Sequence, residues 1–146
     1  TTPQGFLFVT AQYGNVDPNF NATNLAIAAG ATFVARGSVL YPEALEKLFV
    51  QAFSHDGYSF VDTFSNCHIN LSRKNKMGDA TTMLNWIESR VTPKIKFEKM
   101  SEEVRKGLFP LGVLLEDNSH TEYTKAYDEV IKAAQGKTKV NMEAIK

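Results

Sequence analysis

The sequence has almost no cysteine: Cys67 is the only one in 146 residues. A single thiol cannot form an internal disulfide, so we expect a protein of the reducing cytoplasm. The sequence has no local pair of cysteines such as C-x-x-C, which a structural zinc site would need. The sequence shows no signal-like apolar segment, and its longest apolar stretch, residues 25–35, is interrupted by Gly30 and Thr32. We therefore expect no membrane span.

An excess of charge of one sign is also missing, because 16 Lys and Arg balance 16 Asp and Glu. This balance gives no indication of a nucleic-acid partner or of an acidic membrane surface. The charges are unevenly distributed, however. Residues 1–66 carry two cations and five anions, a net charge of −3, and residues 67–146 carry fourteen cations and eleven anions, a net charge of +3. The change separates an apolar front half from a charged back half at Cys67.

The clearest pattern that is present predicts a strand, a helix and a second strand between residues 31 and 64. Residues 31–36 form a continuous apolar and β-branched run, which is typical of a strand buried on both faces. Pro42 suits the first turn of the following helix, and Asp56-Gly57 ends it before a strand over residues 58–64. The apolar residues of this helix recur at core-facing spacing: Leu45, Leu48, Phe49, Ala52 and Phe53. This order predicts a right-handed βαβ unit in a parallel sheet.

Capping and terminating residues predict the elements on either side. A helix over residues 22–29 begins at Asn21 or Thr23 and has Leu25 and Ala28 on one apolar face. We also expect a short strand over residues 6–9, a helix from Asp79 through Val91 to Pro93 and a short helix from Ser101 to Gly107. Residues 109–113 are predicted to form an extended segment that packs on a neighbour. A last helix is predicted from a Ser119 and Glu122 capping box to Gly136, followed by a frayed end over residues 137–146.

Cys67 is the first candidate for a functional residue, because it lies in the loop after the second predicted strand. Ligands of open parallel sheets bind at the carboxyl ends of the strands. Three interpretations stay open at this point. A solitary cysteine is often a small core residue, and a nucleophilic cysteine would need a histidine oriented by a third group. An iron–sulfur cluster needs about four thiolates, of which this chain supplies one.

Three further features have a functional and a structural interpretation. The basic run Arg73-Lys74-Asn75-Lys76 either receives a phosphate-bearing or acidic partner or is a solvated turn. Gly78-Asp79 resembles the start of a metal-binding Gly-Asp-Gly, but Ala80 takes the third place and helix capping accounts for Asp79. Trp86 lies off the main apolar stripe of its helix, so it either faces a partner or widens the buried face. The sequence has no Gly-rich phosphate loop.

Several longer runs resemble a known family. They are residues 24–36, residues 57–62 leading into Ser65-Asn66-Cys67, the block over residues 65–78, the segment Phe109-Pro110-Leu111-Gly112-Val113, the opening Thr-Thr-Pro-Gln-Gly and the following Tyr-Gly-Asn. Over residues 1–135 the chain resembles the carboxyl-terminal half of the beta subunit of 2-oxoacid:ferredoxin oxidoreductases, most closely the enzymes that act on 2-oxoglutarate. A pyruvate or other 2-oxoacid enzyme and a non-catalytic α/β interaction module remain the alternatives.

The resemblance implies an α/β fold with a partial doubly wound parallel sheet, the thiamine diphosphate-binding fold, over residues 1–92. Residues 93–146 are then a helical and extended tail that packs on this domain or on a partner subunit. The implied activity is the oxidative decarboxylation of 2-oxoglutarate to succinyl-CoA, in a complex with alpha and other subunits. Electrons pass through a [4Fe–4S] cluster to ferredoxin or a similar acceptor, and the acyl group passes to coenzyme A.

By the same resemblance, Cys67 is the fourth ligand of the cluster. The family's Gly-Asp-Gly…Asn motif for thiamine diphosphate and Mg²⁺, and its three earlier cluster cysteines, have no counterpart in residues 1–146. We therefore expect the chain to be a piece of a longer subunit. Alone it is expected to bind neither thiamine diphosphate nor a cluster and to have no turnover. It is also expected to self-associate through an exposed sheet edge and an apolar face.

Overall fold

The computed structural model describes residues 2–136 and 138–143, and within them a four-stranded sheet has the order β2-β1-β4-β3. β1 pairs with β2 in parallel and β3 pairs with β4 in parallel, whereas β1 and β4 are antiparallel. The strands are β1 (Phe33–Ser38), β2 (Ser59–Phe64), β3 (Val91–Pro93) and β4 (Phe109–Glu116). The predicted α/β class with a partial, mostly parallel sheet is confirmed. The sequence did not reveal that β4 would pair antiparallel to β1.

The predicted βαβ unit is β1, α2 (Pro42–Ser54) and β2. All six residues of β1 are buried, and Pro42 occupies the first turn of α2. The helix lies very close to the strand: a Cβ atom on Gly37 would be 2.5 Å from Cδ1 of Leu45, so the side chain of Leu45 would have to move. Glycine at this position therefore permits the close packing of α2 on β1.

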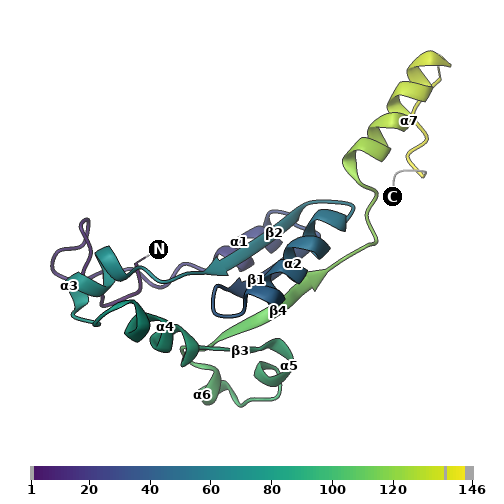
Figure 1. Cartoon of the computed structure of the whole chain (residues 1–146). Helices are drawn as coiled ribbons and strands as arrows, with labels where there is room; N and C mark the ends of the chain where they lie inside the picture. Colours follow the sequence, from purple (N-terminus) through teal and green to yellow (C-terminus); the bar gives the residue numbers. More distant parts are fainter. Residues whose placement is uncertain (1, 137, 144–146) are drawn as a thin grey trace.

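Two apolar clusters lie on opposite faces of β1, because successive side chains of a strand alternate between its faces. Phe33 and Ala35 pack against α2, where Leu48 and Ala52 are buried. Val34 packs on the other side with Ala31 and with Ala26 of α1 (Ala22–Ala28). Figure 1 shows α1 and α2 beside the sheet, and the two clusters place them on its two faces. Together they explain why β1 is buried throughout.

Both helices bury a narrower face than their sequences predict. In α2, Phe49 is partly and Phe53 largely exposed, since β2 is the edge of the sheet and no further strand lies beyond it. In α1 the prediction of the buried face is wrong: Thr23 and Ala26 are buried, whereas Leu25 is 56% exposed. Small side chains let α1 lie close to the sheet and turn its larger residues outward.

The boundaries of α1 follow the prediction. The side chain of Asn21 accepts a hydrogen bond from the backbone N–H of Asn24 at 3.1 Å, which confirms Asn21 as the N-cap. Beyond the last turn, Gly30 has a φ of +86°, the left-handed conformation that glycine adopts at lowest cost.

Three element predictions are corrected. Residues 6–9 contain only an isolated bridge between Phe8 and Ala11 instead of a strand, because the turns around them leave no room for a ladder. Helix α4 (Ala80–Glu88) ends before Val91, since residues 91–93 pair with β4 as β3. Ser119 is not the N-cap of α7 (Tyr123–Gln135): the carboxylate of Glu122 itself accepts hydrogen bonds from the first turn, at the backbone N–H groups of Thr124 and Lys125.

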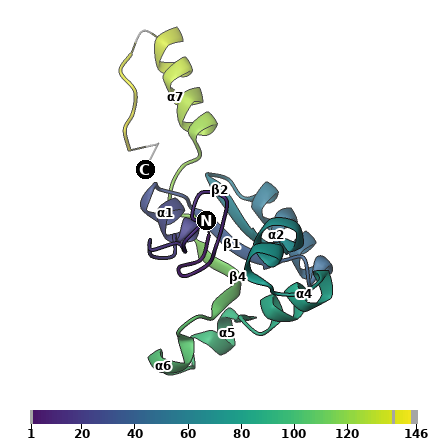
Figure 2. The same ribbon diagram turned by 90° about the vertical axis from the view of Figure 1, so that its left-hand side faces the viewer.

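The back half contributes to the same sheet and then leaves it. The extended segment predicted over residues 109–113 is the first part of β4, and the short helix predicted near Ser101 is α6 (Glu102–Arg105), which follows α5 (Lys94–Phe97). Figures 1 and 2 both show α7 standing away from the sheet and its helices. The division of the chain after residue 92 stays a prediction, and residues 137 and 144–146 of the predicted frayed end lie outside the described residues.

No helix in the described part of the chain is both long enough and apolar enough to cross a membrane.

Candidate functional site

Cys67 lies three residues beyond the end of β2, at the carboxyl edge of the parallel β1–β2 pair. Its thiol is free and half-buried, and the residue belongs to neither of the two apolar clusters. The backbone carbonyl of Cys67 accepts a hydrogen bond from the N–H of Ser72 at 3.1 Å, which closes a wide turn. This turn is η1 (His68–Ser72), a π-helical turn of a kind that is rare and often found at functional sites.

The histidines give Cys67 no oriented base. Nδ1 of His68 lies 3.4 Å from Nδ2 of Asn66, and both side chains come from the same loop. His55 lies before β2, at the opposite end of that strand, where its Nε2 is 2.8 Å from Oγ1 of Thr32. His120 faces Asp117 at 3.5 Å in the segment that leads to α7. A Cys–His pair of the type used in nucleophilic catalysis therefore finds no support here.

The described residues contain no group of three or more His, Cys, Asp or Glu side chains that could hold a metal ion. Cys67 on its own supplies one thiolate, whereas a [4Fe–4S] cluster is held by about four ligands. The chemistry and the position of Cys67 fit one ligand of such a cluster, and residues 1–146 supply no other cysteine. The assignment of Cys67 to a cluster stays a prediction at this point.

An ion pair joins β1 and β2, the strand that leads into the Cys67 loop; the side chain of Arg36 is buried and that of Asp62 is 26% exposed. Nε of Arg36 donates to Oδ2 of Asp62 at 2.8 Å, and a terminal nitrogen of Arg36 donates to Oγ1 of Thr23 at 3.0 Å. The guanidinium lies beside two aromatic rings that contact each other, 5.4 Å from the centroid of Phe64 and 5.6 Å from that of Phe109. One side chain thus joins α1, β1, β2 and β4, and Phe64 is the residue at which β2 ends.

This ion pair was not predicted from the sequence, although the sequence contains a signal for it. Arg36 is the only charged residue in the predicted strand over residues 31–36, and Asp62 is the only one in residues 58–64. The parallel register pairs these two residues directly. A buried charge needs a partner, so opposite charges at matching positions of two strands predicted to be parallel neighbours indicate an ion pair.

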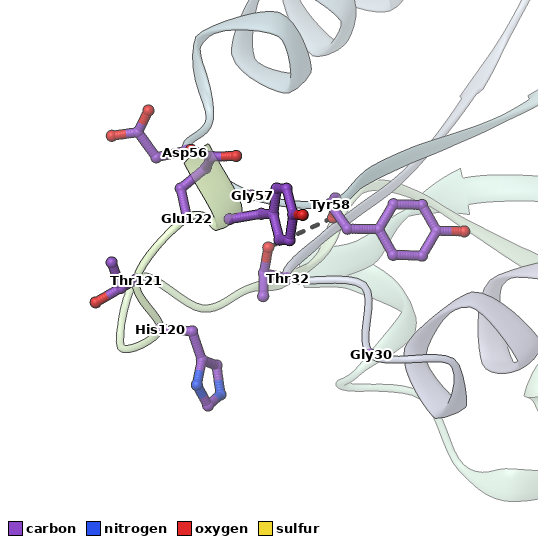
Figure 3. Close-up of a pocket in the computed structure, with 9 residues that line it drawn as sticks. Gly30, Thr32, Asp56, Gly57, Tyr58, His120, Thr121 and Glu122 are labelled. Atoms are coloured by element: carbon purple, nitrogen blue, oxygen red, sulfur yellow. Dashed lines mark hydrogen bonds between the residues drawn. The ribbon is translucent and has the colours of Figure 1, made fainter. Parts of the chain in front are cut away.

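Two hollows lie on the body, and Arg36 is among the residues that line the first of them. One, of about 410 Å³, lies near the carboxyl end of β1 and is lined mainly by apolar groups, among them Tyr41, Leu45, Leu48, Pro93 and Leu111. The other, of about 570 Å³, lies at the opposite edge of the sheet, where Figure 3 shows Thr32, Tyr58 and the segment through His120 and Glu122 around it. The second hollow is therefore separated from Cys67 by the length of β2.

The hollow in Figure 3 marks the joint between the sheet and α7. Lys125 of α7 donates a hydrogen bond to the carboxylate of Asp56, which follows α2. That hydrogen bond is the main cause that lowers the pKa of Asp56 below its ordinary value, and it raises the pKa of Lys125. Both side chains are largely exposed, so water and salt weaken this pair.

Asp79 and Trp86 take structural roles. Oδ1 of Asp79 accepts hydrogen bonds from the N–H and the hydroxyl of Thr82, each at 2.9 Å, which caps α4 and lowers the pKa of the carboxyl. Trp86 packs edge-on against Phe6, with ring centroids 6.0 Å apart, and the guanidinium of Arg90 lies 4.5 Å from its ring. The capping interpretation of Asp79 is confirmed, and Trp86 widens the buried face of its helix.

Comparison with known proteins gives consistent matches. The 2-oxoglutarate synthase subunit KorB of Methanothermobacter marburgensis is 30% identical over 112 residues, which cover 77% of this chain and 39% of that protein. The subunit of the same name from Methanocaldococcus jannaschii is 30% identical over 116 residues, which cover 80% of this chain and 43% of that protein. No family model matches the chain.

A solved structure shares the fold. It is the 2-oxoglutarate:ferredoxin oxidoreductase from Magnetococcus marinus with 2-oxoglutarate, coenzyme A and succinyl-CoA bound. The TM-score is 0.68 at 19% sequence identity, over 98% of this chain and 48% of that one. The chain spans about two fifths of the length of the curated relatives that it matches. By its sequence matches, the chain belongs to the beta subunits of the 2-oxoacid:ferredoxin oxidoreductase family.

Proposed function

We propose that the chain is part of the beta subunit of an enzyme that oxidatively decarboxylates 2-oxoglutarate to succinyl-CoA. In this proposal, electrons leave through a [4Fe–4S] cluster to ferredoxin or a similar carrier. The relatives are 2-oxoglutarate synthase subunits and the solved structure is a 2-oxoglutarate:ferredoxin oxidoreductase, which supports the substrate and the carrier. The observation that carries the proposal is the position of Cys67: the chain's only thiol lies in the loop at the carboxyl edge of the sheet, where ligands of α/β folds bind.

Cys67 would supply one thiolate to the cluster, and the remaining ligands would come from parts of the subunit outside residues 1–146. A bound cluster at this edge supplies one-electron chemistry. Thiamine diphosphate and Mg²⁺ belong to the same proposed enzyme, but residues 1–146 contain no Gly-Asp-Gly motif to hold them. We therefore assign no residue of this chain to either group.

The Arg36–Asp62 pair would position the ligand rather than touch the cluster. The pair and the contact between the tilted rings of Phe64 and Phe109, with centroids 4.8 Å apart, hold the end of β2 against β1 and β4. A thiolate that binds a cluster must be held at fixed geometry, because electron-transfer properties depend on the surroundings of the sulfur. The buried pair would thus keep the Cys67 loop in place.

Helix α7 would provide the contact with an alpha or other subunit of the complex. Its apolar stripe is exposed: Tyr123, Tyr127, Val130 and Ile131 are 74%, 51%, 39% and 43% exposed. A stripe of this kind on a helix that stands away from the body is typical of a surface that is covered in an assembly (Figure 2). The exposed edge of β2 and the same stripe also support self-association of the 146-residue chain. The cytoplasm remains the proposed compartment, supported by the single free thiol.

The test measures iron in the purified complex that contains the full-length subunit. Cys67→Ala is expected to lower the iron content by up to about four atoms per subunit, the content of one [4Fe–4S] cluster. The electron paramagnetic resonance signal of that cluster is expected to disappear. Ser65→Ala, an exposed position in the same loop, is the matched control and is expected to leave both unchanged. Unchanged iron in Cys67→Ala would instead favour the non-catalytic interaction module.

Two further measurements separate the alternatives. The complex is expected to turn over 2-oxoglutarate faster than pyruvate, and the reverse order would assign it to a pyruvate enzyme. The 146-residue chain alone is expected to bind no iron and no thiamine diphosphate and to have no turnover. Stoichiometric iron bound to the 146-residue chain would contradict the proposal that this chain supplies only one ligand, Cys67, to the cluster.

A further inference from the structure

Three exposed cationic side chains follow the Cys67 turn. Arg73 and Lys74 lie in α3 (Arg73–Asn75), and Lys76 comes directly after it; we refer to these three residues as the basic ridge. None of them forms an ion pair within the described residues. Asp79, an acidic residue close to the ridge in sequence, has its carboxylate engaged in the cap of α4. The ridge therefore presents three positive charges that nothing described neutralises.

The residues between these cations hold the ridge in place. The side chain of Asn75 donates to the carbonyl oxygens of Leu7 at 2.9 Å and Leu71 at 2.8 Å, and its Oδ1 accepts from the N–H of Leu7 at 2.8 Å. Ser72 is fully buried, and its carbonyl accepts from the N–H of Met77 at 3.0 Å. A solvated turn needs no such anchoring. The three cations are thus presented outward from a turn fixed on both sides.

Lys76 adopts a backbone conformation that disfavours lysine. Its φ of +52° and ψ of +39° are left-handed, and Lys76 is the only residue other than glycine with a positive φ in the described part of the chain. Glycine occupies such a helix-ending position without steric cost, and asparagine at a lower cost than lysine. Strain of this kind persists only where the surrounding structure fixes the backbone, and it is concentrated at functional sites. Lys76 therefore places a positive charge at a position where glycine would fit the backbone better.

The ridge lies next to the proposed cluster ligand. Only η1 separates Cys67 from Arg73, and the hydrogen bond from Ser72 to Cys67 ties the two ends of that turn together. Arg73 directly follows Ser72, so it lies about one helical turn from Cys67. Figure 1 shows α3 at one end of the molecule, away from the strands, where a second protein can approach.

We propose that the basic ridge is the docking surface for a small acidic electron-carrier protein. The proposal rests on the proposed function, since it needs an electron to leave near Cys67. Charge complementarity decides the partner: three unpaired cations beside an electron exit attract a carrier with an acidic face and orient it toward the cluster. The interaction is mainly electrostatic steering, so it depends on ionic strength.

The test uses the intact complex with two electron acceptors, an acidic two-cluster ferredoxin and methyl viologen. The triple variant Arg73→Gln, Lys74→Gln, Lys76→Gln is expected to raise KM for ferredoxin about tenfold at low salt and to flatten its salt dependence. The rate with methyl viologen and the iron content are expected to stay within twofold of wild type. Lys96→Gln, Lys99→Gln, Lys106→Gln removes three equally exposed cations from the region of α5 and α6 and serves as the control with unchanged KM.

The possible failures are distinguishable. A triple variant with wild-type KM for ferredoxin and wild-type salt dependence overturns the docking surface and leaves the proposed function intact. A rise in KM for coenzyme A without a change for ferredoxin also overturns it, because the ridge would then bind phosphate groups. A wild-type complex that reduces neither ferredoxin nor methyl viologen overturns both proposals together.

Lys76 provides a second variant that does not depend on the triple change. Lys76→Gly removes the charge and relieves the left-handed strain, so Tm is expected to stay equal or rise while KM for ferredoxin rises about threefold. Lys76→Arg restores a charge and is expected to restore KM. A turn that is merely structural would show the change in Tm without any change in KM, and that result would contradict the proposal.

Discussion

Strand β1 and helix α7 both have clear apolar patterns, but the structure buries only the first. In β1, Phe33, Val34 and Ala35 are at most 1% exposed. In α7, Tyr123 is 74% and Tyr127 is 51% exposed. An apolar pattern predicts that a face becomes covered; it does not say which molecule covers it. The cover of β1 comes from α1, α2, β2 and β4 of this chain, whereas the described residues provide no comparable cover for α7 (Figure 2).

The two regions should therefore differ most strongly in how they respond to truncation of an aromatic side chain. Phe33→Ala is expected to lower the free energy of unfolding by about 3–5 kcal/mol, because it leaves a cavity between β1 and α2. Tyr127→Ala is expected to change it by no more than about 0.5 kcal/mol. Urea unfolding followed by circular dichroism measures both. A large loss of unfolding free energy in Tyr127→Ala would show that α7 packs on the body, and the two regions would then not differ.

In the assembled complex, Tyr127→Ala should have a larger effect than in the isolated chain. Tyr127→Ala is then expected to weaken subunit association, since the apolar stripe of α7 would be buried there. Equal association of wild type and variant, measured by analytical ultracentrifugation, would contradict the proposed role of α7.

Two ion pairs sharpen the comparison, because Arg36–Asp62 lies within the body and Asp56–Lys125 joins the body to α7. Asp62→Ala leaves the guanidinium of Arg36 buried without its acceptor, so we expect the free energy of unfolding to fall by about 2–3 kcal/mol. Asp56→Ala removes the exposed pair with Lys125, and no measurable change in stability is expected. Replacing both partners of the buried pair, as in Arg36→Met with Asp62→Leu, is expected to restore part of the loss. A double variant less stable than Asp62→Ala would contradict this explanation.

The sequence predicted the parts of the fold whose contacts are local. The βαβ unit, the Asn21 cap and the Gly30 end of α1 each depend on residues close in the chain, and all are confirmed. The antiparallel pairing of β4 with β1 joins residues about 80 positions apart, so it leaves no trace in local periodicity. The same pairing explains why the predicted helix through Val91 stops early, since β3 forms on β4.

Less of the candidate site was predictable from the residues themselves. The position of Cys67 after a strand followed from the pattern, whereas the anchoring of the basic run by Asn75 depends on a contact with Leu7, 68 residues away. The Arg36–Asp62 pair had a signal in the sequence, but only a known register turns matching positions into a contact. The exposed faces of α1 and α7 could not be predicted, since periodicity does not distinguish a core from an interface.

Changes to the helix caps should have smaller effects, and they test the same difference between the body and α7. Asn21→Ala removes the side-chain acceptor at the start of α1 and is expected to lower the free energy of unfolding by about 1 kcal/mol. Asn21→Gly is expected to lower the free energy of unfolding by only about a few tenths of a kcal/mol. Glu122→Gln alters the cap of α7 and is expected to reduce helix content without changing the urea midpoint of the body. A shifted midpoint for Glu122→Gln would show that the two regions unfold together.

The joint between the regions should give the smallest effect, a change in the orientation of α7 with pH. The pKa of Asp56 is lowered by its hydrogen bond with Lys125, so its contribution is present above the ordinary value of 3.8 and is lost as pH falls through the lower folded value. The pKa of Lys125 is raised by the same bond, so its contribution is present below the ordinary value of 10.5 and is lost as pH rises through the higher folded value. Between these limits the distribution of distances between spin labels on α2 and α7 is expected to stay narrow. In acid this distribution is expected to broaden, while the circular dichroism of the body is unchanged. Asp56→Asn should show the broad distribution at every pH, and a narrow one at neutral pH would mean that contacts other than this ion pair orient α7.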